Sequence, residues 1–324
     1  MAVYTHVSAE ALGDFLTRYD VGELVSAKGI AEGVENSNYM IDTTKGRYFL
    51  TLYEKRVEAD DLPYFMALLD HLADKGLPVP PAIKDRNGVE IQELEGRPAC
   101  LIKFLPGVSL SHPTTAQAKA AGEALGRLHV ATADFPLQRQ NSMGFDSWRL
   151  LLERCGNDLN TIAPGLYDDM RLVLRDIGAT WPIDIDRCAI HADLFPDNLL
   201  MLGDRVTGMI DFYFACTDFR LYDLAVTHTA WSFDVTGTHH YPDVGKALLD
   251  GYRKHFDLDA DPYHFNHHFG DLAVGACVRF TLSRAWDWLN TPADALVTRK
   301  DPLAFWRRLK AYDPNLASLL KTFA

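Results

Sequence analysis

One short stretch near the middle of the chain constrains the fold more than any other. Residues 190–201 read Ile-His-Ala-Asp-Leu-Phe-Pro-Asp-Asn-Leu-Leu-Met, which contains the spacing His-x-Asp-x-x-x-x-Asn. The apolar end of this stretch meets a turn at Gly203, and a second apolar segment then ends at Asp211. Two apolar segments joined by a short glycine-containing turn predict a β-hairpin. Such a hairpin would return Asp211 to the side of Asn198.

This arrangement suits the transfer of a phosphoryl group to a hydroxyl. Asp193 would accept or orient the proton of the attacking hydroxyl, while Asn198 and Asp211 would hold Mg²⁺ against the phosphates of a nucleotide. The alternative is a turn capped by His191, with the two aspartates in surface loops. We disfavour it because the flanking apolar residues should be buried, and buried strand ends rarely carry a carboxylate without a partner.

The composition is that of a soluble globular protein with two lobes or domains. The chain has 324 residues, of which 48% are hydrophobic and 23% are charged. Its net charge of −12 disfavours a nucleic acid or an anionic membrane as a partner. The first residues carry no export signal and no apolar run approaches the length of a membrane span, which favours the cytoplasm. An odd number of cysteines without a C-x-x-C pair indicates reduced, mostly buried thiols: Cys100, Cys155, Cys188, Cys216 and Cys277.

The hydrophobic pattern predicts a strand-rich first part and a helix-rich second part. Strand-like alternation covers residues 22–53 and returns near 89–104, with one amphipathic helix before these strands and another between them. After Pro106 the pattern is mostly helical, apart from the hairpin. We therefore expect an α+β, bilobal fold with an N-lobe at 1–105 and a mainly helical C-lobe at 106–324.

The motif region resembles the catalytic centre of the aminoglycoside phosphotransferase and choline kinase superfamily. Other blocks match this superfamily in the same order: Leu-Pro-Val-Pro at 77–80, Leu-Ile-Lys-Phe-Leu-Pro-Gly at 101–107, Leu-Gly-Arg-Leu-His at 125–129 and Leu-Tyr-Asp-Leu-Ala at 221–225. The resemblance implies a protein-kinase-like fold, with a small mixed β-sheet N-lobe that covers the nucleotide. It also implies that His191 and Asp223 support the catalytic loop.

Further blocks are similar to the bacterial homoserine kinases of this superfamily. These blocks lie at 29–39, 50–56, 96–99 and 279–284. This resemblance implies phosphorylation of the hydroxyl of L-homoserine to O-phospho-L-homoserine, in threonine biosynthesis, with ATP and Mg²⁺. The sequence leaves open the choice between ATP and GTP and the oligomeric state, for which a homodimer is one option.

The loop at 29–38 is the expected cover of the nucleotide phosphates. Its small and polar residues can bring backbone amides close to phosphate oxygens, although an ordinary hairpin turn would look similar. The resemblance adds the third strand and the inter-lobe hinge to the nucleotide site. The residues expected to bind the nucleotide are Gly33, Asn36, Ser37, Asn38, Thr51, Lys103, Phe104 and Leu105.

The third strand departs from the usual kinase pattern. Thr51 occupies the position of the lysine that contacts the α- and β-phosphates in kinase-like folds. Lys55 and Arg56 follow and could reach back, while the next helix has no Glu to pair with a lysine. Either loop amides and Mg²⁺ hold the phosphates alone, or the chain is a poor kinase. We favour the first explanation because the homoserine kinases that it resembles also carry Thr here.

One expected helix carries charges that match the acceptor. Homoserine is a zwitterion, so its site should offer an arginine to the carboxylate and a carboxylate to the ammonium. Arg279, Arg284 and Asp287 supply both charges. Arg284 and Asp287 are three residues apart and therefore adjacent on the helix surface. An intrahelical ion pair would explain these two residues equally well.

Other functions stay compatible with the motif. Another small alcohol, such as choline, an aminoglycoside or a sugar amine, could be the acceptor. A catalytically weak regulator that binds a nucleotide would account for Thr51. A Mg²⁺-dependent phosphatase would normally need an Asp nucleophile motif, which the sequence lacks.

Overall fold

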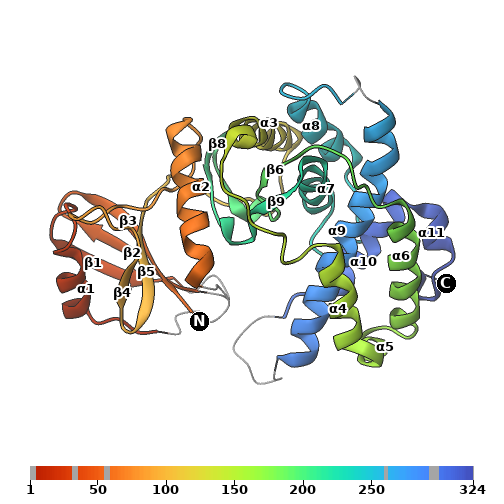
Figure 1. Cartoon of the computed structure of the whole chain (residues 1–324), viewed down its shortest axis with the longest axis horizontal. Coiled ribbons are helices and arrows are strands. Elements are labelled where there is room, and N and C mark those ends of the chain that lie inside the picture. Colours follow the sequence, from red (N-terminus) through yellow and green to blue (C-terminus); the bar gives the residue numbers. More distant parts are fainter. Residues whose placement is uncertain (1–4, 31–35, 55–58, 259–261, 292–298, 324) are drawn as a thin grey trace. The chain divides into compact units, whose positions relative to one another are not determined.

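The chain folds into an α+β protein with two units (Figure 1). One unit comprises residues 1–107 with 207–213, and the other comprises residues 108–206 with 214–324. The first unit contains a five-stranded antiparallel sheet and the second is mainly helical, which confirms the predicted fold class. The structure, a computed structural model, describes residues 5–30, 36–54, 59–258, 262–291 and 299–323.

The five-stranded sheet of the first unit has the order β1-β2-β3-β5-β4. Its strands are β1 (Leu24–Gly29), β2 (Asn36–Thr43), β3 (Gly46–Tyr53), β4 (Gln92–Leu94) and β5 (Arg97–Lys103). Every pair of neighbouring strands is antiparallel. Thr51 in β3 lies opposite Asn38 of β2 on one side and Cys100 of β5 on the other. This register fixes the surroundings of Thr51, the residue predicted to stand where kinase-like folds carry a lysine.

Helices α1 (Ala9–Leu16) and α2 (Leu62–Asp74) cover opposite faces of this sheet (Figure 1). The hydroxyl of Ser8 accepts the N–H of Ala11 at 3.1 Å and caps α1, which packs onto Leu50 and Leu52 of β3. Successive strand residues point to opposite faces, so Thr51 faces α2 instead. The sulfur of Met66 on α2 contacts that of Cys100 on the same face.

The second unit is built mainly from helices. They are α3 (Thr115–Ala131), α4 (Phe145–Cys155), α5 (Leu159–Ile162), α6 (Leu166–Thr180), α7 (Arg220–Trp231), α8 (Pro242–Tyr252), α9 (Pro262–Asn290), α10 (Leu303–Tyr312) and α11 (Pro314–Ser318). Short 3₁₀ helices interrupt the chain at η1 (Ala59–Asp61), η2 (Thr132–Asp134), η3 (Gly156–Asp158), η4 (Pro196–Asn198), η5 (Phe212–Phe214) and η6 (Lys321–Phe323). No helix among the described residues is long and apolar enough to span a bilayer.

Helix α9 is the centre of the second unit. It packs against α4, α6, α7 and α10, and its buried residues lie on nearly every side of the helix between Leu272 and Ala285. A helix that is apolar all round has to be surrounded by other elements. Arg279 therefore starts from the middle of this unit, whereas Arg284, further along α9, is half-buried.

Helices α3 and α8 approach each other closely through two glycines. A Cβ on Gly122 of α3 would lie 1.9 Å from the carbonyl oxygen of Leu248 in α8. A Cβ on Gly251 of α8 would lie 1.9 Å from the carbonyl oxygen of Lys119 in α3. No side chain fits at either place, so glycine at both positions permits backbone-to-backbone packing.

Two pairs of short strands frame the motif loop. β6 (Arg187–Ile190) pairs antiparallel with β9 (Cys216–Phe219). β7 (Leu199–Leu202) and β8 (Arg205–Met209) form the predicted hairpin, whose turn contains Gly203 with a φ of 62°. The loop with the His-x-Asp-x-x-x-x-Asn motif runs from the end of β6 to the start of β7.

Candidate active site

The motif residues Asp193 and Asn198 contact each other directly. The side-chain amide of Asn198 donates to the backbone oxygen of Asp193 at 2.8 Å and to its carboxylate Oδ2 at 3.3 Å. Asn198 is buried at the end of η4, whereas Asp193 is half-buried. Asn198 thus holds the carboxylate of Asp193 in one orientation.

Asp223 anchors the backbone of the same loop from α7. Its carboxylate is fully buried and accepts the backbone N–H of His191 and that of Ala192, each at 2.8 Å. The side chain of His129 on α3 contacts the same carboxylate at 3.0 Å, and the hydroxyl of Tyr252 contacts the other ring nitrogen of His129 at 2.9 Å. A chain of buried polar contacts therefore links α8, α3 and α7 to the loop.

The charges in this buried chain follow from its surroundings. Burial lowers the pKa of His129, so its ring is neutral and donates a hydrogen bond from Nε2 to Asp223. Burial acts in the opposite direction on Asp223, but hydrogen bonds from His129 and from the amide of His191 bring its pKa below the usual range. Asp223 is therefore an ionised carboxylate whose charge is stabilised by hydrogen bonds.

Two further side chains hold the loop by its carbonyl groups. Arg279 on α9 is 2% exposed and donates to the backbone oxygen of Ala192 at 2.5 Å. The indole of Trp231 on α7 donates to the backbone oxygen of Leu194 at 2.9 Å. The sequence suggested Arg279 as a ligand of the acceptor, but its guanidinium donates to the loop, and contact with the acceptor stays a prediction.

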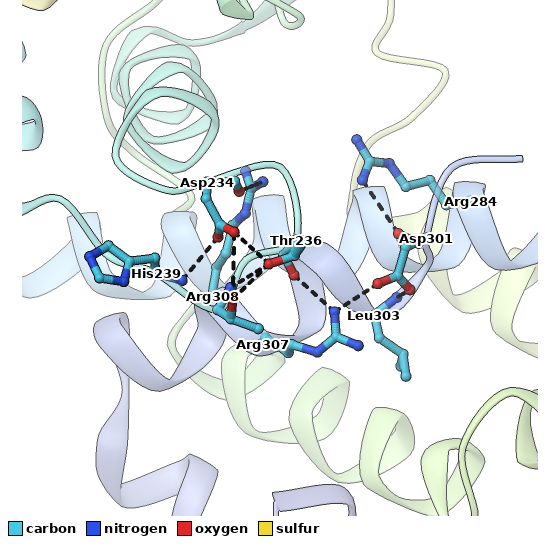
Figure 2. Close-up of polar contacts among 9 residues, drawn as sticks. Asp234, Thr236, His239, Arg284, Asp301, Leu303, Arg307 and Arg308 are labelled. Atoms are coloured by element: carbon cyan, nitrogen blue, oxygen red, sulfur yellow. Dashed lines mark hydrogen bonds and ion pairs between the residues drawn. The ribbon is translucent and has the colours of Figure 1, made fainter. Parts of the chain in front are cut away.

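Arg284 lies beside a polar cluster formed by the loop after α7 and the beginning of α10 (Figure 2). Its guanidinium is 3.4 Å from the backbone oxygen of Asp301. The carboxylate of Asp301 binds Arg307 at 2.7 Å instead, and Arg307 also donates to the backbone oxygen of Thr236 at 2.8 Å. Across the described ranges, neither Asp287 nor any other carboxylate forms an ion pair with Arg284.

The electrostatic surroundings of Arg284 favour an anion. Burial and the neighbouring Arg308 lower the pKa of Arg284 to about 10, although Asp193 acts in the opposite direction. A desolvated guanidinium near a second one gains from a carboxylate partner. Asp287 lies exposed on α9, and a role for it in binding the acceptor ammonium stays a prediction.

The predicted metal ligands have the right chemistry for a divalent cation. Within the described chain, the amide oxygen of Asn198 makes no hydrogen bond, because the contacts of its side chain all come from Nδ2. Asp211 is exposed after β8 and has a left-handed backbone with a φ of 66°. Amide and carboxylate oxygens suit Mg²⁺. The two residues belong to different units, so their meeting at one ion stays a prediction.

In the first unit, Thr51 takes part in a network of neutral groups. Its hydroxyl donates to the side-chain oxygen of Asn38 at 2.8 Å. The ring of Tyr213 packs against that of Tyr53, with 5.6 Å between the centroids. Burial raises the pKa of the Tyr213 phenol above its usual range, and nearby Asp211 adds to the effect. The position predicted for the kinase lysine thus holds hydroxyl and amide groups in this protein.

The other residues predicted for the nucleotide loop mostly hold the sheet together. The buried Ser37 donates to the carboxylate of Glu54 at 2.7 Å, and Asn36 accepts the backbone N–H of Glu54 at 3.4 Å. Arg97 pairs with the same carboxylate at 3.3 Å. Gly33 lies outside the described residues, as do Lys55 and Arg56, so the phosphate contacts proposed for this loop stay predictions.

The predicted hinge residues follow the end of β5. Lys103 is exposed, whereas Phe104 and Leu105 are half-buried. The ring of Phe104 packs on that of Phe49 in β3, with 5.6 Å between the centroids. Their contact with a nucleotide base stays a prediction.

Several residues of these networks were not predicted from the sequence, among them Tyr213, Arg308 and His129. Tyr213 follows Asp211 by two positions, but an aromatic residue there is no specific signal. Arg308 on α10 is 3% exposed and donates to the backbone oxygens of Thr229 and Asp234 (Figure 2). His129 was the one residue with a usable signal, because it ends the block at 125–129 that matches the superfamily.

Comparison with known proteins identifies relatives along almost the whole chain. Residues 26–260 match the model of the phosphotransferase enzyme family. A homoserine kinase of Zymomonas mobilis subsp. mobilis is 50% identical over 322 residues, which are 98% of this chain and 99% of that protein. A homoserine kinase of Nitrobacter winogradskyi is 49% identical over 315 residues, 96% of this chain and 94% of the relative.

Solved structures agree with the fold at low sequence identity. Amicoumacin kinase in complex with AMP-PNP and Ca²⁺ has a TM-score of 0.70 at 16% identity, covering 96% of this chain and 94% of that one. Choline kinase from Cryptosporidium parvum Iowa II has a TM-score of 0.69 at 15% identity, covering 94% of each chain. Since about half of its residues also match curated homoserine kinases end to end, this chain belongs to the phosphotransferase enzyme family, in the branch of the homoserine kinases.

Proposed function

We propose that the protein transfers the γ-phosphoryl group of ATP to the hydroxyl of L-homoserine, forming O-phospho-L-homoserine and ADP. The observation that carries this proposal is the high identity to curated homoserine kinases over nearly the full length of both chains. The product places the reaction in threonine biosynthesis. For a soluble metabolic activity of this kind, the cytoplasm is the proposed location.

Asp193 is the proposed catalytic base. Its carboxylate is held by Asn198, on a loop whose backbone Asp223 anchors from within the core. In this position Asp193 accepts the hydroxyl proton of homoserine as the oxygen attacks the γ-phosphorus and ADP leaves. Fixing this carboxylate before the substrate binds removes part of the entropic cost of the reaction.

The nucleotide is proposed to bind with a divalent cation, Mg²⁺. The cation, bound through Asn198 and Asp211, would supply electrostatic stabilisation of the phosphates. The loop at 29–38 and Thr51 are proposed to contact the phosphates through neutral donors, and the hinge at Lys103, Phe104 and Leu105 to contact the base. Asn38, which accepts the hydroxyl of Thr51, supports this assignment because its amide nitrogen remains as a donor.

Arg284 is the proposed ligand of the homoserine carboxylate. It belongs to the same unit as Asp193, its guanidinium is largely desolvated, and Asp301 gives it only a long contact through a backbone oxygen. Asp287 is proposed for the ammonium group. An acceptor that has both charges would then satisfy the site.

A coupled assay of ADP release over a panel of amino alcohols tests this proposal. The panel contains L-homoserine, D-homoserine, choline, an aminoglycoside and a buffer control without acceptor. We expect L-homoserine to have the highest kcat/KM by at least about tenfold. Equal turnover of choline would contradict the acceptor assignment and leave phosphotransfer in place. No ADP release with any acceptor would contradict both and favour a nucleotide-binding regulator.

A further inference from the structure

The peptide group between Ala192 and Asp193 is held at each of its polar atoms. Its carbonyl oxygen accepts from the guanidinium of Arg279 at 2.5 Å, and its N–H donates to Nδ1 of His191 at 3.2 Å. Directly before it, the N–H of Ala192 donates to Asp223 at 2.8 Å. The orientation of this peptide plane determines the direction in which the Asp193 side chain leaves the backbone.

Ala192 has a backbone conformation that an alanine would not choose by itself. Its φ is 63°, in the left-handed region, where the Cβ of an L-residue crowds the backbone. Such strain persists only where surrounding contacts impose it, and it concentrates at functional sites. Arg279 supplies the contact on the carbonyl side of this strained residue.

Burial of the charged Arg279 side chain has an energetic cost. The side chain is 2% exposed, and within the residues that the structure describes no carboxylate forms an ion pair with it. Its guanidinium lies over the rings of Phe280 and Phe214, at 4.6 Å and 5.2 Å from their centroids. Burial alone would lower the pKa of Arg279, but Tyr222 and Asp193 raise it above the usual range, so the guanidinium stays charged.

We propose that Arg279 is a positioning residue, which holds the Ala192 carbonyl and thereby fixes the direction of Asp193. The proposal rests on the proposed role of Asp193 as the base. Arg279 acts through the loop, and it needs no contact with homoserine or ATP. Its aromatic neighbours keep the guanidinium fixed in place, so its hydrogen bond remains aimed at one carbonyl.

Arg308 offers a matched control on another helix. It is 3% exposed, donates to backbone oxygens at 2.7 Å and 3.0 Å, and lies 3.9 Å from the centroid of the Phe305 ring. Arg308 therefore shares the burial, donors and aromatic contact of Arg279, but its carbonyl acceptors are Thr229 and Asp234. Substitution at either position removes a similar buried guanidinium, and only position 279 is in contact with the catalytic loop.

The experiment compares Arg279→Met with Arg308→Met by two measurements. Single-turnover phosphoryl transfer is followed with whichever acceptor the panel identifies. Hydrogen exchange of the folded protein is followed in a peptide that covers residues 187–198, which needs no acceptor. We expect Arg279→Met to lower the rate by about 10- to 100-fold, with KM values for both substrates within about twofold. We also expect faster exchange in this peptide, whereas Arg308→Met should leave its exchange within about twofold of that of the wild type.

A conservative pair keeps the test decisive if the methionine variants do not fold. Arg279→Lys keeps the charge and one donor, so we expect it to recover part of the rate relative to Arg279→Met, and Arg308→Lys to match the wild type in the exchange of this peptide. A wild-type rate in Arg279→Met, or equal exchange in matched variants at 279 and 308, would overturn the proposal. A normal rate in Asp193→Asn would instead remove the base assignment, while the exchange result would still report whether Arg279 holds the loop.

Discussion

At the scale of single residues, Asp193 owes its position to its neighbours more than to its own sequence context. Asn198 fixes the carboxylate, and Asp223 and Arg279 fix the backbone on either side of Ala192. The spacing of the motif predicted that Asp193 and Asn198 would meet. It carried no signal for the partner of Arg279, because nothing in a sequence tells which loop a side chain 87 residues away will reach.

Asp193→Asn tests the proposed base. The amide keeps the shape of the side chain but cannot accept the hydroxyl proton in the same way, so kcat should fall by about 10²–10⁴. Binding of the nucleotide should change little, because Asp193 is not one of its proposed ligands. Steady-state kinetics with a parallel measurement of ATP affinity checks both expectations. A turnover close to that of the wild type would take Asp193 out of this role.

Asp211→Ala tests the proposed metal ligand. Removing a carboxylate ligand should abolish turnover and weaken the binding of Mg-ATP far more than that of ATP without metal. Calorimetric titration with ATP in the presence and in the absence of Mg²⁺ separates the two effects. Asp204→Ala, in the turn of the same hairpin, is the control and should bind both forms normally. An unchanged dependence on Mg²⁺ in Asp211→Ala would contradict the assignment.

Arg284→Ala tests the proposed carboxylate site. The variant should raise KM for homoserine and leave KM for ATP nearly unchanged, because the acceptor carboxylate loses its partner at a cost of about 1–3 kcal/mol. Arg284→Lys should recover only part of the loss, since an ammonium cannot make the two-pronged contact. Kinetics over a range of homoserine concentrations gives both values. A normal KM in Arg284→Ala would show that Arg284 is structural.

At the scale of elements, the sequence pattern predicted those helices and strands that bury only one face. Helix α1 was predictable because Leu12, Phe15 and Leu16 form a stripe and Ser8 caps its start. The pairing of β6 with β9 was missed because strands of four residues hold too few residues to show alternation. Helix α10 was missed because the buried Arg308 interrupts its apolar face.

Helix α7 contains a histidine that makes the stability of the larger unit depend on pH. His228 is buried, its Nδ1 contacts the hydroxyl of Tyr312 at 2.7 Å, and burial together with His240 lowers its pKa to about 4. In the unfolded chain, histidine has a pKa of about 6.5. The neutral ring therefore contributes to stability. This contribution is complete at pH values above the pKa of the unfolded state, and it is lost as the pH falls toward the pKa of the folded state.

Urea unfolding of the wild type and of His228→Gln at about pH 7.5 and about pH 5 measures this contribution. When the pH is lowered from the higher to the lower value, the free energy of unfolding should fall by about 2 kcal/mol more in the wild type than in the variant. Fluorescence of tryptophan reports the larger unit. Equal losses in the two proteins would show that His228 titrates normally in the folded state.

At the scale of the whole molecule, each of the two units has a hydrophobic core of its own. All six tryptophans lie in the larger unit, and none lies in residues 1–107 or 207–213. The α+β class was predictable from the change in hydrophobic period along the chain. The return of residues 207–213 to the first unit was not predictable from the sequence, because it depends on contacts such as that of Met209 with Pro78.

Separate cores predict that the molecule does not unfold in one step. Tryptophan fluorescence follows the larger unit, whereas far-ultraviolet circular dichroism follows both units. In the absence of ligands, the two urea transitions should have different midpoints. Superimposable transitions would mean that the two units unfold together.

Thr51 also has a consequence for chemical labelling. Reagents that acylate the phosphate-binding lysine of kinase-like folds require an amine on the third strand, and here the buried hydroxyl of Thr51, bonded to Asn38, is predicted to stand at that position. Such reagents should modify surface lysines of this protein without being competed by ATP. Selective lysine-directed inhibitors of other kinases would accordingly not label Thr51 in this enzyme.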